Sequence, residues 1–569
     1  MVLPASGRRK SHRSYSAVLC LVLLVVTTTA QGAYTEDSEQ EEPLPAHLLK
    51  QILYEETADR IHALGKISDA EGSLVRTFFS PAHIRAASQI RKWMREAGLR
   101  TWLDAVGNVH GRVDGRARDA PALILGSHYD TVMDAGKYDG ALGIIVAIAS
   151  VKASLLQAAL DARIMRPEEV RAAVRESADL GQWLGNKAHK LFTMPLEIVA
   201  FSDEEGVRFQ TTFLGSRGLT GKLVAEGMLE QEDRNGETLS DVLYKHGYQG
   251  SEEALARAAY IPNQVRGYVE IHMEQGPVLE SRGYAVGPVA AIAGQTRLSV
   301  SVEGTQGHAG TVPMKGRQDA MTAVAEAVLW IERMCGGGAY LDAHSAPTAG
   351  VDAEAEAVED RTDDSLVCTT GSVSLWPGAS NVIAGAANFS VDVRCRSDEL
   401  RHATAQAITD QIDAICDRRG VNCSTSIKHQ APAAACHPDM IAALVDACRA
   451  SEPMIEELLG RAQDCEWDCR GELTRDSNTT STDVAEELLQ HANCGGRQVS
   501  SRWEDGQAPV LVSGAGHDSL PMSEITKMGM LFVRDRGGIS HSPLEYVAPE
   551  DIAAAAAALY MYLRKEMLL

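Results

Sequence analysis

Along most of the chain, short runs of consecutive apolar residues alternate with longer stretches in which apolar residues recur at helical spacing. The short runs predict buried strands at 107–113, 122–126 and 196–201. The longer stretches predict helices at 47–64, 80–97 and 139–153. Strands and helices that alternate in this way are typical of an α/β fold with a mostly parallel central sheet flanked by helices. In such folds ligands bind beyond the carboxyl ends of the strands.

The pattern changes at about residue 296. Strands are predicted at 297–302, 369–375, 387–394 and 421–429, with helices at 320–334 and 399–418. Their order, βαββαβ, predicts a separate α+β domain in which helices cover one sheet. Because the first pattern resumes near residue 440, we expect this small domain to be inserted into the larger one.

These changes set the predicted domain boundaries. The larger domain would consist of residues 47–295 and 436–569, and the inserted domain of residues 296–435. Residues 155–190 resemble a helix-prone surface insertion without chemistry, and 345–364 and 465–505 resemble loops.

The N-terminus carries the features of a secretory signal. Four basic residues precede a short apolar stretch at 17–26, and Thr28-Thr29-Ala30 offers a cleavage site. We therefore expect residues 1–33 to be a signal peptide and the chain to enter the endoplasmic reticulum or secretory pathway. An uncleaved anchor or an organelle transit peptide remains the alternative. No other stretch is long enough to predict a membrane span, so no membrane is expected for the mature protein. Residues 34–46 are acidic and predicted to be disordered.

Length and charge narrow the function classes. A chain of 569 residues suggests two or more domains with ample core. A net charge of -23 without a long basic run argues against a nucleic-acid partner. Cys465, Cys469 and Cys494 lie in one polar region, where they could pair in an oxidising lumen or stay free.

Residues suited to a metal site follow two of the predicted strands. His128, Asp130 and Asp139 come after the strand at 122–126, and Glu204 and Glu205 come after the strand at 196–201. Imidazole and carboxylate groups suit Zn²⁺ or Mn²⁺. One carboxylate that bridges two ions creates a two-metal site, and a second beside it can take a proton from water. The pattern predicts a hydrolase dependent on divalent metal ions, although each residue alone could equally be a turn or a solvated helix end.

Six short segments together resemble the binuclear metallo-amidohydrolases of the M20 peptidase-like class, and in particular its branch acting on ureido and carbamoyl compounds. The segments are His128-x-Asp130, Asp139-Gly140, Glu204-Glu205-Gly206, His272-x-Glu274-Gln275-Gly276-Pro277, Gly307-His308-Ala309-Gly310 and Ser540-His541-Ser542-Pro543. The resemblance spans roughly residues 49–565. The segment from Ser513 to Pro543 is most similar to the allantoate amidohydrolases of that branch.

The resemblance implies two divalent ions per subunit, with Mn²⁺ expected and Zn²⁺ as the alternative. His128 and His272 would bind the first ion, Glu205 and His541 the second, and Asp139 would bridge both. Asp130 would fix the tautomer of His128. Glu204 would act as general base and then as general acid. His517 and Asp518 would lie next to the metal ligands and hold them in place without binding metal themselves.

The resemblance also implies the substrate contacts. Gln295, Asn381 and Arg394 would bind a small ureide, with the Arg394 guanidinium on its carboxylate. His308 would reach the active site of a second subunit and stabilise the oxyanion there, which implies a homodimer joined through the inserted domain. A surface arginine and a structural turn are the plainer interpretations of Arg394 and His308.

The expected reaction is hydrolysis of one ureido group of allantoate, giving ureidoglycine, ammonia and carbon dioxide in purine catabolism. Ureidoglycolate and N-carbamoyl-L-amino acids remain alternative substrates, because enzymes for all three share the metal ligands. A peptidase or aminoacylase less often has the form of the segment that begins at His272. A non-catalytic binding protein on this fold would be expected to lack a metal ligand or Glu204, and none of these is missing.

Overall fold

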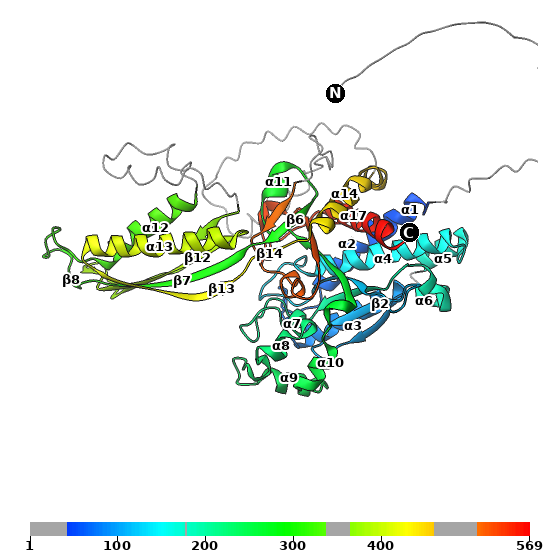
Figure 1. Cartoon of the computed structure of the whole chain (residues 1–569), viewed down its shortest axis with the longest axis horizontal. Helices are drawn as coiled ribbons and strands as arrows, with labels where there is room; N and C mark the ends of the chain where they lie inside the picture. The colour runs from blue at the N-terminus through cyan, green and yellow to red at the C-terminus, as the bar shows by residue number, and fades with distance from the viewer. Residues whose placement is uncertain (1–42, 177–178, 337–364, 460–508, 569) are drawn as a thin grey trace, which may run out of the picture. The chain divides into compact units, whose positions relative to one another are not determined.

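The structure is a computed structural model that describes residues 43–176, 179–336, 365–459 and 509–568 (Figure 1). The predicted signal peptide, most of the acidic segment after it, the loop at 345–364 and Cys465, Cys469 and Cys494 lie outside the described residues. Within them the fold confirms the prediction: a mostly parallel central sheet flanked by helices, and a separate antiparallel sheet covered by two helices.

The central sheet has nine strands in the order β1-β2-β4-β3-β5-β16-β6-β14, with β15 also paired to β6. Four neighbours at its centre run parallel: β4 (Leu196–Phe201), β3 (Ala122–His128), β5 (Val265–Met273) and β16 (Met528–Val533). The other strands are β1 (Arg100–Leu103), β2 (Val109–Val113), β6 (Val286–Ile292), β14 (Ala434–Ala435) and β15 (Leu511–Ser513). The carboxyl ends of the four parallel strands therefore meet at one edge of the sheet.

Helices bury both faces of this sheet. On β3, Leu123 and Leu125 join one hydrophobic core and Ile124 joins the other, because successive strand residues point to opposite faces. The larger core contains helices α2 (Glu56–Gly65), α3 (Pro81–Glu96), α4 (Ala141–Asp161), α14 (Pro438–Leu459) and α17 (Pro549–Met567). The opposite face packs against α7 (Leu214–Thr220) and α16 (Ser519–Met522). A satellite core holds α9 (Leu239–Lys245) and α10 (Glu252–Ala258).

Helix α4 is longer than predicted. It runs to Asp161, and Leu155, Leu156 and Ala159 are fully buried, so the start of the supposed surface insertion belongs to the core. The rest of that insertion forms α5 (Pro167–Arg175), α6 (Leu180–Leu184) and a 3-10 turn. Among the described residues, α4 is the one helix long and apolar enough to cross a membrane, and its most apolar window lies wholly inside the fold.

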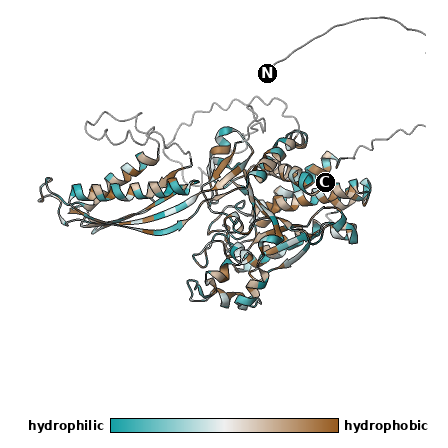
Figure 2. Cartoon of the chain, in the orientation of Figure 1, coloured by the Kyte–Doolittle hydropathy of each residue, from teal (hydrophilic) through white to brown (hydrophobic). Residues whose placement is uncertain are grey.

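The second sheet is antiparallel and has the order β10-β12-β7-β13, with β9 also paired to β12. Its strands are β7 (Gly294–Glu303), β9 (Val367–Thr369), β10 (Val373–Trp376), β12 (Ala386–Cys395) and β13 (Asn422–Ala431). Helices α12 (Ala320–Cys335) and α13 (Asp398–Arg419) cover one face, where Val300, Val391 and Ile408 are buried. The strand β13 is largely hydrophilic (Figure 2).

Two details of this sheet differ from the sequence pattern. The strand predicted at 369–375 is divided into β9 and β10, which pair with different parts of β12. Two disulfides, Cys335–Cys368 and Cys416–Cys423, tie the helices to the strands. Neither pair was predicted. Cys335 and Cys368 are brought together by the packing of α12 on β9, and Cys416 and Cys423 by the short turn between α13 and β13.

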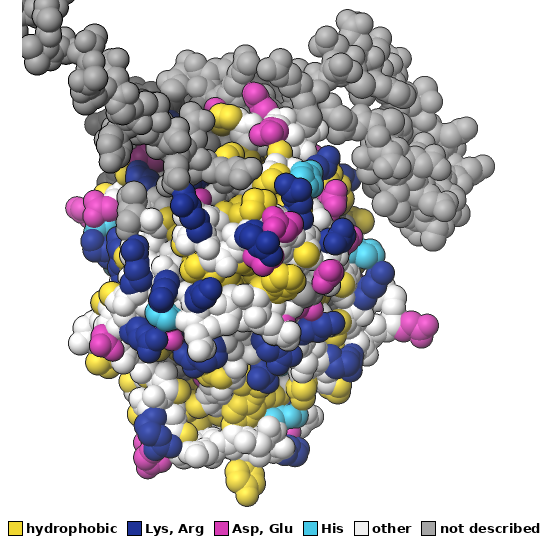
Figure 3. Space-filling view, turned by 90° about the vertical axis from the view of Figure 1, so that its right-hand side faces the viewer, with side chains coloured by type: hydrophobic (Ala, Val, Ile, Leu, Met, Phe, Trp, Pro, Cys, Tyr) yellow, Lys and Arg dark blue, Asp and Glu magenta, His cyan; other side chains and the backbone are white. Residues whose placement is uncertain are grey.

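One face of the molecule carries many basic side chains, although the net charge of the chain is -23. Figure 3 shows this face, where acidic side chains and hydrophobic areas lie among the Lys and Arg side chains.

Candidate metal centre

His128 and His272 lie side by side at the carboxyl edge of the central sheet. His128 is the last residue of β3, and His272 is the last but one of β5. The parallel register, with Gly126 opposite Glu270, brings their rings to 5.8 Å between centroids. Both imidazoles are buried.

Asp139 lies between these histidines and His541. Its Oδ1 is 3.5 Å from His128 Nε2 and 3.1 Å from His272 Nε2. Its Oδ2 is 3.2 Å from His541 Nε2. The two oxygens of one carboxylate thus face two different sets of nitrogen ligands, which is the arrangement that a bridging ligand requires.

The close approach of Asp139 depends on the glycine that follows it. Gly140 has φ +62°, and a Cβ there would lie 2.5 Å from ring atoms of His128. A side chain at this position would therefore push the Asp139 loop away from β3. The loop leads directly into α4, which is held in the core.

Glu205 and His541 form, together with Asp139, a second set of possible metal ligands. Glu205 follows β4 and His541 follows β16, so both come from loops at the same edge of the sheet. His541 Nε2 is 3.5 Å from Glu205 Oε1. The ligand atoms of His128, Asp139 and His272 all lie within 4.8 Å of one another, as do those of Asp139, Glu205 and His541. The structure thus brings together all five predicted ligands in the predicted grouping.

His128 and His272, the predicted ligands of the first ion, each contact a neighbouring oxygen through Nδ1. His272 Nδ1 donates to the Met273 carbonyl at 2.9 Å, which leaves Nε2 free to bind a cation. His128 Nδ1 lies 3.3 Å from Asp130 Oδ1. Partners of this kind fix the tautomer and orientation of a metal-binding imidazole. Asp130, as predicted, lies beside His128.

Burial and neighbouring charge shift the pKa values of the acidic groups. Burial alone would raise the pKa of Asp139, but the imidazoles of His128, His272 and His541 hold it well below its usual range. Burial, with the nearby charge of Asp139, raises the pKa of Glu205 to about 7. This crowding of buried carboxylates is costly unless cations neutralise it.

Glu204 lies close to its neighbour Glu205 and to His128. Its side chain is buried, and its ligand atom also lies within 4.8 Å of those of His128 and Glu205. Burial, together with the carboxylates of Glu205 and Asp518, raises the pKa of Glu204 well above its ordinary value. A raised pKa makes the carboxylate a stronger base, which is suited to accepting a proton from water.

His517 and Asp518 lie behind the ligands. The ring of His517 packs edge-on against His272, with centroids 4.4 Å apart, and its Nε2 is 2.7 Å from Ser513 Oγ. Burial, with the nearby charge of His272, lowers the pKa of His517 well below its usual range, so the ring is neutral. Asp518 is fully buried, and burial raises its pKa.

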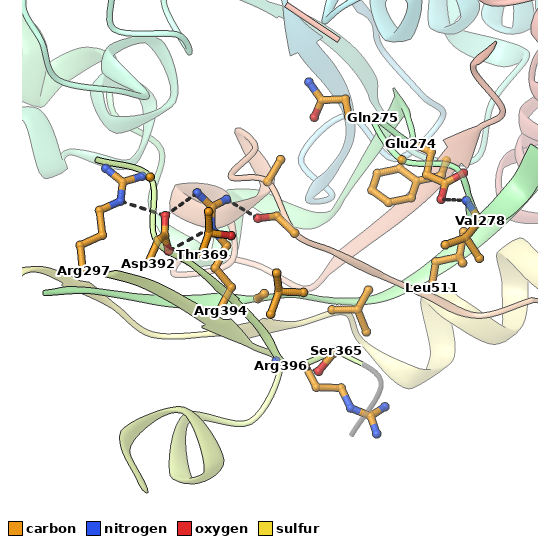
Figure 4. Close-up of a pocket in the computed structure, with 18 of the residues that line it drawn as sticks. Glu274, Gln275, Val278, Arg297, Ser365, Thr369, Asp392, Arg394, Arg396 and Leu511 are labelled. Atoms are coloured by element: carbon orange, nitrogen blue, oxygen red, sulfur yellow. Dashed lines mark hydrogen bonds and ion pairs between the residues drawn. The ribbon is translucent and has the colours of Figure 1, made fainter. Parts of the chain in front are cut away.

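A cleft of about 970 Å³ opens between the central sheet and the second sheet (Figure 4). Gln275 lines it on one side, and Arg394 and Arg297 line it on the other. Arg394 donates from Nε and Nη2 to the two oxygens of Asp392, at 3.2 and 2.9 Å. Its Nη1 donates to the Gly514 carbonyl at 2.6 Å. The guanidinium predicted to bind a carboxylate therefore faces the cleft, held from two directions.

The other predicted substrate residues lie elsewhere in the single chain. Gln295 is directly opposite Arg394 on the neighbouring strand but does not line the cleft. Asn381 and His308 are neighbours: β8 (Gly307–His308) pairs with β11 (Val382–Ile383), and Ala309 N donates to the Asn381 carbonyl at 2.9 Å. Both residues are exposed. Figure 1 shows β8 at the end of the second sheet away from the central sheet.

Gln275 belongs to the segment that begins at His272, and no role was predicted for it. Its Nε2 donates to Asp139 Oδ2 at 3.1 Å and to Ser540 Oγ at 2.8 Å. Since Gln275 also lines the cleft, it connects the metal ligands with the space for a substrate. Its φ of +56° marks an unusual backbone at a fixed position.

The residues present suit a pair of divalent cations. One set offers two imidazole nitrogens and a carboxylate oxygen, and the other offers one imidazole nitrogen and two carboxylates. Such mixed nitrogen and oxygen sets are typical ligands of Zn²⁺ and Mn²⁺. His541, with half of its side chain exposed, leaves access from the solvent side.

Comparisons with known proteins find relatives over most of the chain. Residues 184–565 match the family model described as peptidase family M20/M25/M40. The chain is 41% identical over 533 residues to allantoate deiminase 1 of Glycine max, which covers 94% of this chain and 92% of the relative. It is 30% identical over 504 residues to an N-carbamoyl-L-amino-acid amidohydrolase of Pseudomonas sp. (strain NS671), with 88% and 96% covered.

A solved structure shows the same fold. The amidase of the hydantoinase/carbamoylase family from Burkholderia multivorans superposes with a TM-score of 0.64 at 23% identity, covering 90% of this chain and 97% of that one. The likeness therefore extends over both sheets.

Proposed function

This chain belongs to peptidase family M20/M25/M40, and we propose that it is an allantoate amidohydrolase, an enzyme that hydrolyses one ureido group of allantoate. The products would be ureidoglycine, ammonia and carbon dioxide. Relatives that are 41% identical over 94% of the chain carry the name allantoate deiminase, whereas the N-carbamoyl-L-amino-acid amidohydrolase is 30% identical. This difference favours allantoate over N-carbamoyl amino acids as the substrate.

The observation that carries the proposal is the position of Asp139 between two ligand sets. Two divalent cations, when bound there, would polarise the ureido carbonyl and make a water molecule nucleophilic at neutral pH. His128 and His272 would hold one cation, and Glu205 and His541 the other. Mn²⁺ is the proposed metal, because carboxylates, which suit this ion, fill three of the six ligand positions when Asp139 is counted at both cations.

Glu204 would manage the protons of the reaction. Its carboxylate takes a proton from the attacking water and later gives it to the nitrogen that leaves as ammonia. The carbamate that remains breaks down to the amine and carbon dioxide. Arg394 would hold the substrate carboxylate through its planar guanidinium, which fixes the reacting ureido group relative to Glu204.

A homodimer is proposed because the substrate residues of one chain lie too far apart. The register of β7 and β12 places Gln295 opposite Arg394, and Glu303 opposite Ala386, eight residues further along. That length of strand spans about 27 Å. His308 and Asn381 lie beyond that end, so they cannot share a ligand with Arg394 of the same chain. They would serve the active site of a second copy, where His308 would stabilise the oxyanion.

Entry into the secretory pathway is also proposed, with residues 1–33 as the signal peptide. The two disulfides of the second sheet support it, because disulfides persist in oxidising compartments and are rare in the cytosol. Expression with a fluorescent tag at the C-terminus would test this: an endoplasmic reticulum pattern is expected, and a diffuse cytosolic one would contradict it.

The activity is tested by ammonia release from allantoate, ureidoglycolate and an N-carbamoyl-L-amino acid, each supplied with Mn²⁺. We expect the highest kcat/KM for allantoate. Glu204→Gln should bind metal normally but lose about 10²–10⁴-fold in turnover, because an amide accepts no proton. A higher kcat/KM for another substrate would reassign the enzyme within its family. If none of the three substrates is hydrolysed although two ions are bound, a non-catalytic binding protein would be favoured.

A further inference from the structure

Glu545 holds the backbone of the bridging residue. Its Oε1 accepts the backbone N–H of Tyr138 at 2.8 Å and that of Asp139 at 3.0 Å. The side chain is buried, at 5% exposure. The loop is packed against it, because a Cβ added at Gly136 would collide with the Glu545 side chain. The position of Asp139 is therefore set from outside its own loop.

Glu545 belongs to the same short segment as His541. Three residues lie between them, and the Glu545 N–H donates to the Ser542 carbonyl at 3.0 Å, which closes the turn. This one segment thus contacts Asp139 twice. His541 Nε2 approaches its carboxylate at 3.2 Å, and Glu545 Oε1 accepts its N–H at 3.0 Å. The two contacts join parts of the chain about 400 residues apart, as the sequence numbers show.

We infer that Glu545 is a positioning residue that sets the bridging carboxylate of Asp139 relative to His541, and thereby builds the second cation site. The inference rests on the proposed two-metal site. The first site depends less on Glu545, because His128 and His272 are fixed at the ends of β3 and β5. Loss of Glu545 should therefore weaken the second ion much more than the first.

The test measures metal binding, not activity alone. Wild type and Glu545→Ala are titrated with Mn²⁺ in competition with a chelator, and bound metal is counted by elemental analysis. Wild type should bind two ions. Glu545→Ala should keep one ion and bind the other about 10–100-fold more weakly, the usual effect of removing a partner of a metal ligand. Glu545→Gln should bind close to wild type, because its amide oxygen still accepts both N–H groups.

Asp233→Ala is the matched control. Asp233 Oδ1 also accepts two backbone N–H groups, from Asn235 at 2.8 Å and Glu237 at 3.1 Å, but in a turn that contains none of the proposed metal ligands. It should bind two ions normally. Equal loss of metal in Asp233→Ala and Glu545→Ala would overturn the inference, and so would two ions bound to Glu545→Ala with wild-type affinity.

Two further results separate the possible failures. If Glu545→Ala does not fold, Glu545→Asp takes its place, since a carboxylate one methylene shorter cannot reach both N–H groups. Normal binding of the second ion to Glu545→Asp would also overturn the inference. If wild type itself does not bind two ions, the proposed function fails. If wild type binds two ions and Glu545→Ala binds them equally well, only the role of Glu545 is removed.

Discussion

The carboxylate of Asp130 accepts the backbone N–H of Glu204 at 3.0 Å. Its other oxygen accepts the N–H of Glu205 at 3.2 Å, and the same side chain lies 3.3 Å from His128 Nδ1. Asp130 therefore orients His128, which is proposed to bind the first ion. It also orients the loop with Glu204, the proposed base, and Glu205, a proposed ligand of the second ion. This explains why Asp130 follows His128 so closely: the end of β3 places both beside the end of β4.

Replacement of Asp130 by alanine should therefore damage metal binding and turnover together. We expect bound metal to fall below two ions per chain and kcat to fall by about 10–100-fold or more. Asp130→Asn, which keeps one acceptor oxygen, should lose less. Elemental analysis and kinetics of the two variants check this. A variant Asp130→Ala with two tightly bound ions and normal turnover would contradict this role.

That the proposed metal ligands lie together could be predicted from sequence, because their positions follow from strand ends. His128, Glu205 and His272 each lie at the end of a strand or directly after it, and parallel strands bring those ends to one edge. The division of these residues between two ions comes from the family resemblance and remains a prediction. The prediction ended α4 too early because residues 155–190 taken together are rich in Ala, Arg and Glu. The start of that stretch is apolar, and Leu155, Leu156 and Ala159 are buried in the core.

Other features could not be read from the sequence. The contact between Glu545 and Asp139 depends on how β16 and the following loop return to the Asp139 loop, and no local pattern records it. The disulfide Cys335–Cys368 likewise depends on the packing of α12 against β9. Gln295 was predicted to bind substrate, and the structure places it opposite Arg394 but outside the lining of the cleft. Its role remains a prediction.

A buried histidine far from the metal centre should make stability depend on pH. His110 Nδ1 lies 2.6 Å from Glu197 Oε1, and its Nε2 lies 3.2 Å from Asp104 Oδ2. Burial lowers the pKa of His110, but the two carboxylates outweigh it and raise the pKa to about 9. The charged imidazole therefore stabilises the fold fully below the unfolded pKa of about 6.5, and this is lost as pH rises through about 9.

His110→Gln removes this titration. The free energy of unfolding of wild type minus that of the variant should shrink by roughly 3 kcal/mol between about pH 6 and about pH 10, by linkage to the pKa shift. Urea unfolding at both pH values measures it. His62→Gln, at an exposed position on α2, is the control and should show no such change. A difference for His110→Gln that stays constant with pH would show that the imidazole is not charged in the fold.

Arg394→Lys should weaken substrate binding and spare the metals. The guanidinium of Arg394 has several N–H donors in one plane, whereas the lysine ammonium is a single point charge. A lysine could therefore not keep the hydrogen bonds to Asp392 and Gly514 and also bind a substrate carboxylate. We expect KM for allantoate to rise by about 10-fold or more, as for loss of one charged hydrogen bond, with two ions still bound. Arg396 lines the same cleft, so Arg396→Lys is the control, and we expect its KM for allantoate to equal that of wild type. An unaltered KM in Arg394→Lys would remove this residue from the carboxylate site.

The last prediction concerns assembly. His308→Ala and Glu204→Gln should each be nearly inactive, because one lacks the oxyanion contact and the other lacks the base. In a mixed dimer, one site combines the intact Glu204 of one chain with the intact His308 of the other. Random exchange of equal amounts makes half of the dimers mixed, each with one complete site, so about a quarter of wild-type activity should return.

The double variant carrying both changes provides the converse measurement. Mixed with an equal amount of wild type, it should lower the activity of the wild-type chains to about half after exchange, because each mixed dimer has no complete site. Recovery of two differently tagged chains in one dimer shows that exchange has occurred. If exchange is proven but the single variants regain nothing and the double variant inhibits nothing, His308 acts within its own chain or not at all.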